Sequence, residues 1–169
     1  MSNSEILRGA VALAESGIHV CPAYGIRELD GERFCACVRG PSCEMAGKHP
    51  FGKSWQHAGT RDADEVRERF RIAVGRDDRP MNVSILTGQR YGLLVLDVDG
   101  PEGIAALNRL TAEHGELPAT PAASTGGGGL HYLFRSVEDP IRNSARRLGP
   151  KLDIRGEGGQ IIAPPSQHL

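Results

Sequence analysis

An apolar segment near the middle of the chain ends in two acidic residues. Residues 92–103 have the sequence GLLVLDVDGPEG, in which a run of aliphatic residues leads into Asp97 and Asp99. A short apolar run predicts a buried strand, and Pro101 suits the first turn of a helix that follows. Residues two apart on a strand point to the same face, so the two carboxylates are predicted to lie side by side. Such a pair repels itself unless a positive group lies between the charges.

The order of predicted elements along the chain indicates the fold class. Helices are predicted first at the N-terminus, capped by Asn3 or Ser4, then at 62–72 and at 101–114. Strands are predicted at 18–22, 82–87, 91–98, 122–124, 130–135, 151–155 and 160–163, with 82–87 and 91–98 joined by a turn at Gly88. Helices come early and strands dominate late, which predicts an α+β domain with a mixed or antiparallel sheet.

Composition narrows the class of protein. The chain has 169 residues, 39% of them hydrophobic and 24% charged, which suits one soluble domain. The net charge of −1 excludes a global basic field for nucleic acid, although a local basic patch remains compatible with it. No apolar run approaches the length of a membrane-spanning helix, and the N-terminal segment lacks the basic start of a signal peptide. We therefore expect a cytoplasmic protein with reduced cysteines.

Three of the four cysteines are clustered with a histidine in the segment CACVRGPSCEMAGKH. Three thiolates and one imidazole make a complete tetrahedral zinc shell, which is typical of a structural site. The candidate ligands are Cys35, Cys37, Cys43 and His49. One of them could be replaced by Cys21, His19 or His57. The alternative is a plain loop with free thiols, and on either interpretation residues 24–53 show little periodicity.

A second constellation joins Asp97 and Asp99 to Asp153, which lies in the predicted strand of KLDIRGEGG. Three carboxylates from two neighbouring strands can hold two divalent cations, and Mg²⁺ prefers oxygen ligands. A cation between the carboxylates would remove their repulsion. The alternative is that Asp99 and Gly100 form a simple turn while Asp97 caps the following helix.

A histidine and a basic segment lie near these acidic residues in the sequence. His131 shares one face of its predicted strand with Leu133, after a run of four glycines at 126–129 that permits close approach of a ligand. We expect His131 to contact a phosphate of an incoming nucleotide. The most basic part of the chain, which could neutralise a triphosphate or a template backbone, contains Arg142, Arg146, Arg147, Lys151 and Arg155.

The motifs together resemble a known family. LLVLDVDG, STGGGGLHYLF and KLDIRGEGGQIIAPPS, in this order, are similar to the archaeo-eukaryotic primase superfamily. The resemblance is strongest to the N-terminal domain of bifunctional DNA primase/polymerases (prim-pol) found on phages, plasmids and integrated elements. It includes CACVRGPSCEMAGKHP, followed by Trp55, as a zinc-binding insertion, and NVSILTG as the strand before the first acidic motif. It extends from about residue 18 to residue 166.

This resemblance implies a fold and a set of site residues. The fold would be a four-stranded RRM-like catalytic sheet with a second α/β unit before it and a zinc insertion at about 30–53, in a single domain of residues 1–169. Asp97, Asp99 and Asp153 would bind the catalytic Mg²⁺ or Mn²⁺, with His131 completing the catalytic set. Ser124, Lys151 and Arg155 would join His131 in binding the nucleotide.

The resemblance also implies an activity. This is template-directed nucleotidyl transfer from NTPs or dNTPs, in primer synthesis or primer extension on single-stranded DNA. The chain would be the N-terminal part of a longer replication protein, with a helicase as domain or partner. Two alternatives stand beside it. One is a haloacid-dehalogenase-type phosphatase with Asp97 as nucleophile and Asp99 as acid/base; the other is a non-catalytic, zinc-stabilised DNA-binding module.

Overall fold

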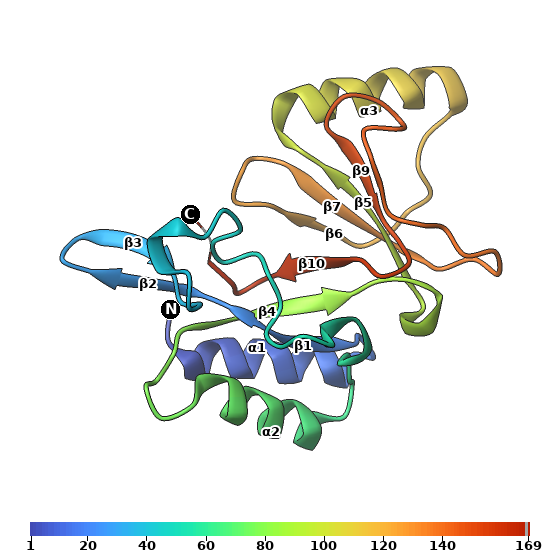
Figure 1. Cartoon of the computed structure of the whole chain (residues 1–169). Helices are drawn as coiled ribbons and strands as arrows, with labels where there is room; N and C mark the ends of the chain where they lie inside the picture. The colour runs from blue at the N-terminus through green and yellow to red at the C-terminus, as the bar shows by residue number, and fades with distance from the viewer. Residues whose placement is uncertain (168) are drawn as a thin grey trace. The chain divides into compact units, whose positions relative to one another are not determined.

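The computed structural model describes residues 1–167 and 169, which form two compact units. The first unit comprises Met1–Leu86 with Ile161–Leu169, and the second comprises Thr87–Gln160. Each contains a sheet and at least one helix (Figure 1), so the predicted α+β class is confirmed. Within the described residues, no helix is both long enough and apolar enough to cross a membrane.

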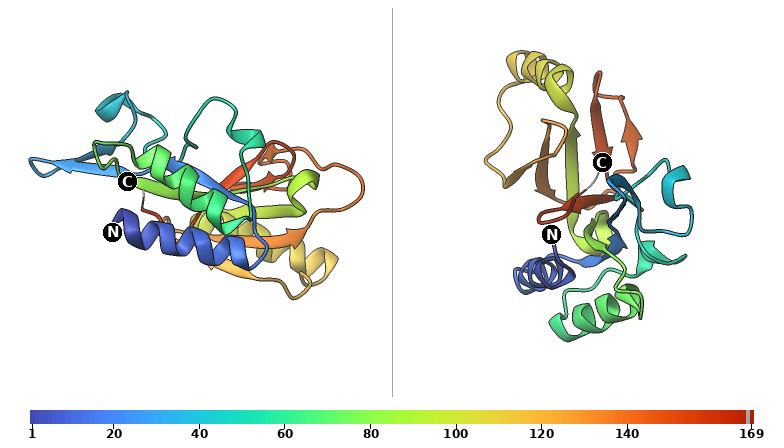
Figure 2. Two further views of the ribbon diagram at one scale, coloured as in Figure 1. Left: turned by 90° about the horizontal axis from the view of Figure 1, so that it is seen from below. Right: turned by 90° about the vertical axis from the view of Figure 1, so that its left-hand side faces the viewer.

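The first unit is built on a three-stranded sheet with two helices against it. Its strands are β1 (Val20–Tyr24), β4 (Met81–Leu86) and β10 (Gln160–Ala163), in the order β1-β4-β10, with β1 and β4 antiparallel. Helices α1 (Asn3–Glu15) and α2 (Ala63–Val74) pack against each other and against β1 and β4 (Figure 2). The central strand β4 is buried along its whole length, its polar residues Asn82 and Ser84 included.

The N-terminus of α1 differs from the prediction. Ser2, rather than Asn3 or Ser4, is the N-cap, and it forms a capping box with Glu5. The Glu5 N–H donates to the Ser2 hydroxyl, and the Ser2 N–H donates to the Glu5 carboxylate at 2.7 Å. Two N–H groups that a helix start leaves unpaired are satisfied in this way, which neither Asn3 nor Ser4 would achieve as well.

A β-hairpin that the sequence analysis did not predict follows β1. Strands β2 (Ile26–Leu29) and β3 (Glu32–Cys35) are antiparallel and are joined by two residues with positive φ, Asp30 at 52° and Gly31 at 82°. Positive φ at both positions is the geometry of a type I′ turn, for which Asp-Gly is a preferred pair. The short 3₁₀ helices η1 (Gly40–Ser42) and η2 (Trp55–His57) complete the segment before α2.

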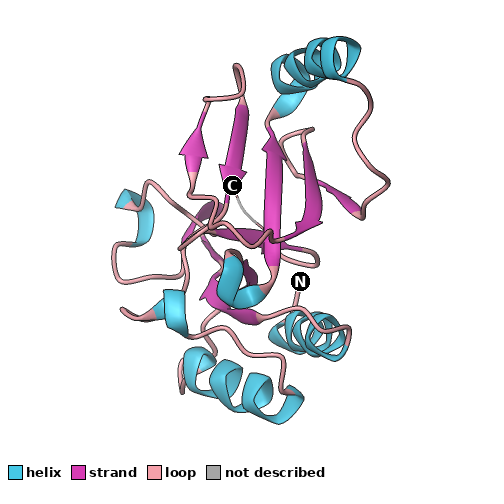
Figure 3. Cartoon of the chain, turned by 90° about the vertical axis from the view of Figure 1, so that its right-hand side faces the viewer, coloured by secondary structure: helices cyan, strands magenta, loops and turns pink. Residues whose placement is uncertain are grey.

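The second unit contains a five-stranded antiparallel sheet. Its order is β6-β7-β5-β9-β8, and the strands run side by side in Figure 3. They are β6 (Ala122–Ser124), β7 (Leu130–Arg135), β5 (Leu93–Val98), β9 (Leu152–Arg155) and β8 (Ser144–Ala145). The resemblance implied four strands. The additional one, β8, is a two-residue edge strand and is too short for an alternating pattern to reveal it.

Helix α3 (Gly100–His114) covers one face of this sheet. Leu96, Val98 and Leu152 from the sheet form a buried cluster with Ala106 and Leu107 of the helix. Because side chains alternate along a strand, residues between these apolar positions point to the other face. The helix therefore fixes which face of β5 and β9 carries polar side chains.

The two strands predicted at 82–87 and 91–98 are joined through the Gly88 segment, but they belong to different sheets. Strand β4 belongs to the three-stranded sheet and β5 to the five-stranded one, with the 3₁₀ helix η3 (Gln89–Tyr91) between them. Both edges of each strand are already occupied, β4 by β1 and β10, and β5 by β7 and β9. A strand with two partners has no free edge for a third, so the Gly88 segment connects two sheets rather than two paired strands.

Candidate functional site

The three predicted carboxylates converge on the sheet of the second unit. Asp97 on β5 is directly opposite Asp153 on β9 in the strand register, and Asp99 follows the end of β5. Asp97, Asp99 and Asp153 each offer one oxygen, and these oxygens lie within 4.8 Å of one another. The alternation that buries Leu96 and Val98 under α3 directs Asp97 to the opposite face.

His131 lies in the same row of the sheet. It is the register partner of Asp97 on β7, so His131, Asp97 and Asp153 form a row across three adjacent strands. The His131 Nε2 atom is 3.2 Å from Asp97 Oδ1, and both side chains are largely buried. Leu130, Tyr132 and Phe134 turn to the other face and pack on the core beneath α3.

Arg155 bridges two of the carboxylates. Its Nη2 atom is 2.8 Å from Asp97 Oδ2 and 3.0 Å from Asp153 Oδ2. Burial raises the pKa of Asp97, but hydrogen bonds and charge from His131 and Arg155 outweigh this effect, so the pKa lies below its usual range. Arg155 was predicted to contact phosphate. In the structure it is the positive group between Asp97 and Asp153.

The cluster has more acidic than basic side chains, because three carboxylates lie near one guanidinium and one imidazole. Oxygen ligands of this number and type suit Mg²⁺ or Mn²⁺. The alternative in which Asp97 caps α3 is not observed: Asp97 lies within β5, and the N-cap position belongs to Asp99, whose side chain makes no capping hydrogen bond. The Asp99 side chain is exposed and can turn toward a cation.

The two other predicted nucleotide-binding residues are placed differently. Lys151 precedes β9, and its carbonyl accepts a hydrogen bond from the Asp99 N–H at 2.9 Å. Ser124 is opposite Leu130 in the register, and Leu130 packs beneath α3. Residues directly opposite in a sheet share a face, so Ser124 lies on the face that packs on α3, away from the acidic cluster. The backbone of Lys151, in contrast, is bonded next to that cluster.

The glycine run before β7 approaches the strand end that carries Asp99. A Cβ atom at Gly129 would overlap the carbonyl oxygen of Val98 and come within 3.0 Å of the Gly100 nitrogen. The Gly129 N–H donates to the Thr125 hydroxyl at 3.0 Å, which closes the loop. In contrast, a Cβ at Gly127 would have no atom within 4 Å.

We expect Gly129→Ala to destabilise the protein by about 3 kcal/mol, since the new methyl group forces apart the backbone of two packed segments. This corresponds to a fall in melting temperature of roughly 6–12 °C in a thermal unfolding scan. Gly127→Ala is the matched control, and it should change the melting temperature by less than about 2 °C. Equal melting temperatures for the two variants would contradict the close approach of Gly129 to β5.

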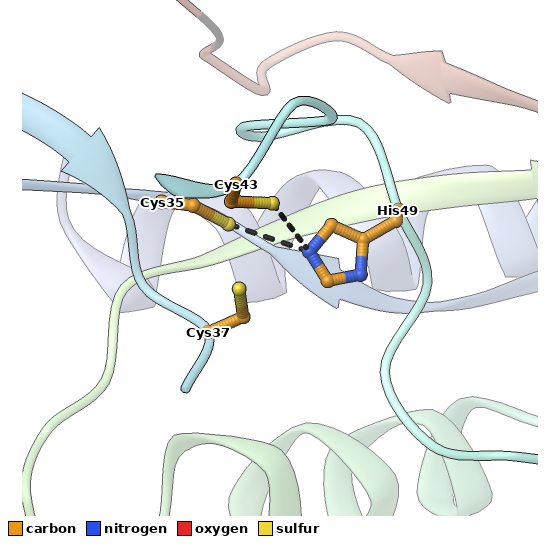
Figure 4. A group of neighbouring side chains, drawn as sticks. All are labelled: Cys35, Cys37, Cys43 and His49. Atoms are coloured by element: carbon orange, nitrogen blue, oxygen red, sulfur yellow. Dashed lines mark hydrogen bonds between the residues drawn. The ribbon is translucent and has the colours of Figure 1, made fainter. Parts of the chain in front are cut away.

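The predicted zinc ligands form a second cluster, in the first unit (Figure 4). Cys35 Sγ and Cys43 Sγ are 3.4 Å and 3.5 Å from His49 Nε2, and Cys37 lies beside them. Cys35 ends β3, so the unpredicted hairpin carries the first ligand. Cys21 lies on β1, outside this cluster. The structure therefore brings together Cys35, Cys37, Cys43 and His49 and not the replacements considered.

The protonation of these ligands depends on burial and on Arg39. Burial raises the pKa of Cys35 to about 11 and lowers the pKa of His49, and Arg39 lowers the latter further. Burial also raises the pKa of Cys37, but hydrogen bonds from the Arg39 backbone and from the other two thiols outweigh it and lower the pKa overall. Arg39 Nη2 is 3.6 Å from Cys43 Sγ. The sequence analysis missed this role, although Arg39 lies within the cysteine segment itself.

Both clusters fit the metals that their donor atoms suggest. Three thiol sulfurs and one imidazole nitrogen match a tetrahedral zinc shell, and the Tyr24 ring packs on His49 with centroids 4.7 Å apart. The carboxylate oxygens of Asp97, Asp99 and Asp153 match hard cations such as Mg²⁺, which prefer oxygen ligands.

Comparison with known proteins places these features in a family. A search of curated proteins found no match. The family model described as bifunctional DNA primase/polymerase, N-terminal, matches residues 10–169. This match includes both clusters, the glycine run and all strands of the two sheets. Since it extends over nearly the whole sequence, the chain belongs to the bifunctional DNA primase/polymerase family and corresponds to its N-terminal domain.

Proposed function

We propose that this chain catalyses template-directed nucleotidyl transfer on single-stranded DNA, with Asp97, Asp99 and Asp153 as ligands of two divalent cations. Family membership supports DNA primase or polymerase activity in general. The observation that carries the finer proposal is the proximity of Asp97 on β5, Asp153 on β9 and Asp99 just after β5, each with one oxygen within 4.8 Å of the others. The setting we propose is replication of a phage, plasmid or integrated element, in which the chain synthesises or extends primers.

In this reaction the 3′-hydroxyl of a primer, or of a first nucleotide, attacks the α-phosphate of an incoming NTP or dNTP. The hydroxyl proton passes to solvent, a bond forms between the hydroxyl oxygen and the α-phosphorus, and the bond from that phosphorus to the bridging oxygen breaks so that pyrophosphate leaves. When bound, Mg²⁺ or Mn²⁺ would lower the pKa of the attacking hydroxyl and neutralise charge on the leaving group. In such a site, most of the rate enhancement over the uncatalysed reaction comes from positioning the reactants and neutralising their charge.

The protein side chains divide this work between them. Asp97 is held by Arg155 and His131, so its oxygens are fixed in the row that also contains Asp153. The face opposite α3 is therefore already organised before a cation or nucleotide arrives, which lowers the cost of binding. His131, Lys151 and Arg155 are the proposed phosphate contacts. Once a cation lies between the carboxylates, the Arg155 guanidinium is the group that can turn to a phosphate oxygen.

We further propose that Cys35, Cys37, Cys43 and His49 bind one structural zinc ion. All four ligand positions come from the protein, which leaves no open position for a substrate. Its role would be to hold the segment after the β2–β3 hairpin, a stretch that contains few apolar side chains of its own.

The test of the proposed activity is nucleotide incorporation by the wild-type protein. Labelled NTPs or dNTPs are supplied with primed and unprimed single-stranded DNA and with Mg²⁺ or Mn²⁺. We expect label in the DNA that follows the template and disappears when the divalent cation is chelated. Template-independent release of inorganic phosphate without incorporation would instead support the phosphatase interpretation of Asp97 and Asp99. DNA binding with neither reaction would support the non-catalytic module.

A further inference from the structure

The loop between β8 and β9, residues 146–151, is bonded at both ends to residues of the acidic cluster. At its start, the Arg146 N–H donates to Asp153 Oδ1 at 3.0 Å. At its end, the Lys151 carbonyl accepts from the Asp99 N–H at 2.9 Å. These bonds use backbone atoms, so both side chains are left out of them, and both residues are exposed. The loop therefore fixes the backbone of two exposed cationic residues next to Asp99 and Asp153.

Arg146 and Lys151 share an unfavourable backbone conformation. Their φ angles are +58° and +59°. In the described part of the chain, the other non-glycine residues with positive φ are Asp30 and Asp78, and aspartate is among the few side chains that tolerate this region. Arginine and lysine have no such compensation, and glycine would adopt the conformation without strain. Backbone strain of this kind clusters at active sites and ligand-binding loops.

The negative charge of the acidic cluster creates a need for positive side chains where a nucleotide binds. A nucleotide polyphosphate carries several negative charges, and it must approach three carboxylates of the same sign. Arg155 is shared with Asp97 and Asp153, so it supplies only part of the positive charge that the polyphosphate needs. Additional positive charge is needed at the edge of the cluster, at positions fixed relative to Asp99 and Asp153. Arg146 and Lys151 satisfy this requirement, because their own peptide groups are bonded to those two residues.

We infer that Arg146, together with Lys151, binds the polyphosphate of the incoming nucleotide, and that the strained backbone of the loop is retained to place these two side chains. The inference rests on the proposed nucleotidyl transfer and deepens it by adding Arg146 and a physical reason for Lys151. The neighbouring Arg147 lies in the same loop and is equally exposed, but it does not have the left-handed conformation. It belongs to the same basic segment, but the proposal gives it no contact with the polyphosphate.

The test separates side-chain function from strain. Arg146→Gly and Lys151→Gly keep the backbone bonds and remove the strained side chain, so the melting temperature should stay the same or rise by up to about 3 °C. The KM for the nucleotide should rise about tenfold in each variant, the effect of losing one charge-assisted hydrogen bond. Arg146→Lys keeps the charge and should recover most of the loss. Arg147→Ala, the matched control, should change KM by less than about twofold.

A second measurement distinguishes this inference from the proposed function. Binding of inorganic tripolyphosphate to the full chain, measured by titration calorimetry with Mg²⁺ present, does not depend on catalysis. We expect the Arg146→Gly affinity to fall about tenfold. If the wild type fails to incorporate nucleotides, the proposed function fails, and this titration still decides the role of the loop. Unchanged tripolyphosphate affinity in both glycine variants would overturn the inference, as would an equal loss in Arg147→Ala or a clear drop in their melting temperatures.

Discussion

Asp97→Asn should lower the rate of nucleotide incorporation by a factor on the order of a thousand or more, which corresponds to about 4 kcal/mol of transition-state stabilisation. The asparagine side chain would keep the size of the aspartate and could still accept a hydrogen bond from Arg155. It would lack the charge that, in our proposal, helps to hold the cations. The measurement is primer extension under single-turnover conditions, with circular dichroism to confirm that the variant is folded.

The matched control for Asp97→Asn is Asp64→Asn. Asp64 also pairs with an arginine, Arg67, at 2.9 Å, but its side chain is 95% exposed whereas that of Asp97 is 10% exposed. An exposed pair contributes little, so the control should retain the wild-type rate within about twofold although it loses the same formal charge. If Asp97→Asn retained more than a tenth of the wild-type rate, Asp97 would not be a ligand of the reacting cations.

Asp153→Asn should give a loss of the same order as Asp97→Asn, and the double variant should lose little more than either alone. Groups that act together on one reaction step are strongly non-additive. Asp97 and Asp153 share both Arg155 and the proposed cations. Once one carboxylate is lost and cation binding is disrupted, removing the second should lower the incorporation rate little further. Additive losses would mean that the two carboxylates act independently, contrary to a shared site.

The face of the sheet that carries the site could be predicted from the sequence, because alternation is a local property. Leu96 and Val98 flank Asp97, and Leu130 and Tyr132 flank His131, so each polar side chain must point away from the apolar ones. Alternation does not reveal which strands are neighbours. That Asp97 lies opposite both His131 and Asp153 depends on long-range pairing. Their proximity was anticipated from the metal-binding chemistry of the carboxylates and from the family resemblance, not from the strand pattern.

The carboxylate contacts of Arg155 and the β2–β3 hairpin were not predicted from the sequence, for two different physical reasons. Arg155 lies two residues after Asp153, so the sequence did place both on one face. Whether its guanidinium would contact phosphate or carboxylate depended on distances across the sheet. The hairpin had a local signal, the Asp30-Gly31 pair. Its strands lack a clear alternation of apolar residues, since they are mostly polar and partly exposed, and this obscured them.

Loss of the zinc ligands should have the second large effect, this time on stability. We expect the purified protein to contain about one zinc ion per chain, and Cys35→Ala to contain almost none. Zinc binding stabilises only the folded state, so its loss should cost several kcal/mol and lower the melting temperature by roughly 10 °C or more. Metal analysis and thermal unfolding, each with and without a chelator, measure the two effects.

Cys21→Ala provides a closely matched control for Cys35→Ala. Both thiols are 1% exposed, so the two substitutions remove the same atom from equally buried positions. Burial raises the pKa of Cys21 to about 12, and Cys21 lies on β1 outside the cluster. The control should therefore keep its zinc and lose only packing and one hydrogen bond with Ser84, about 1–2 kcal/mol in total.

The pH dependence of zinc binding provides an independent check on the same four residues. Cys35, with its pKa raised to about 11, is protonated at neutral pH in the absence of metal, and its thiolate is required as a ligand. Binding must therefore release a proton, and the affinity for zinc should fall steadily as the pH is lowered. A zinc content that is equal in the Cys35→Ala and Cys21→Ala proteins would exclude the cluster as the site, because only one of these two buried cysteines lies in it.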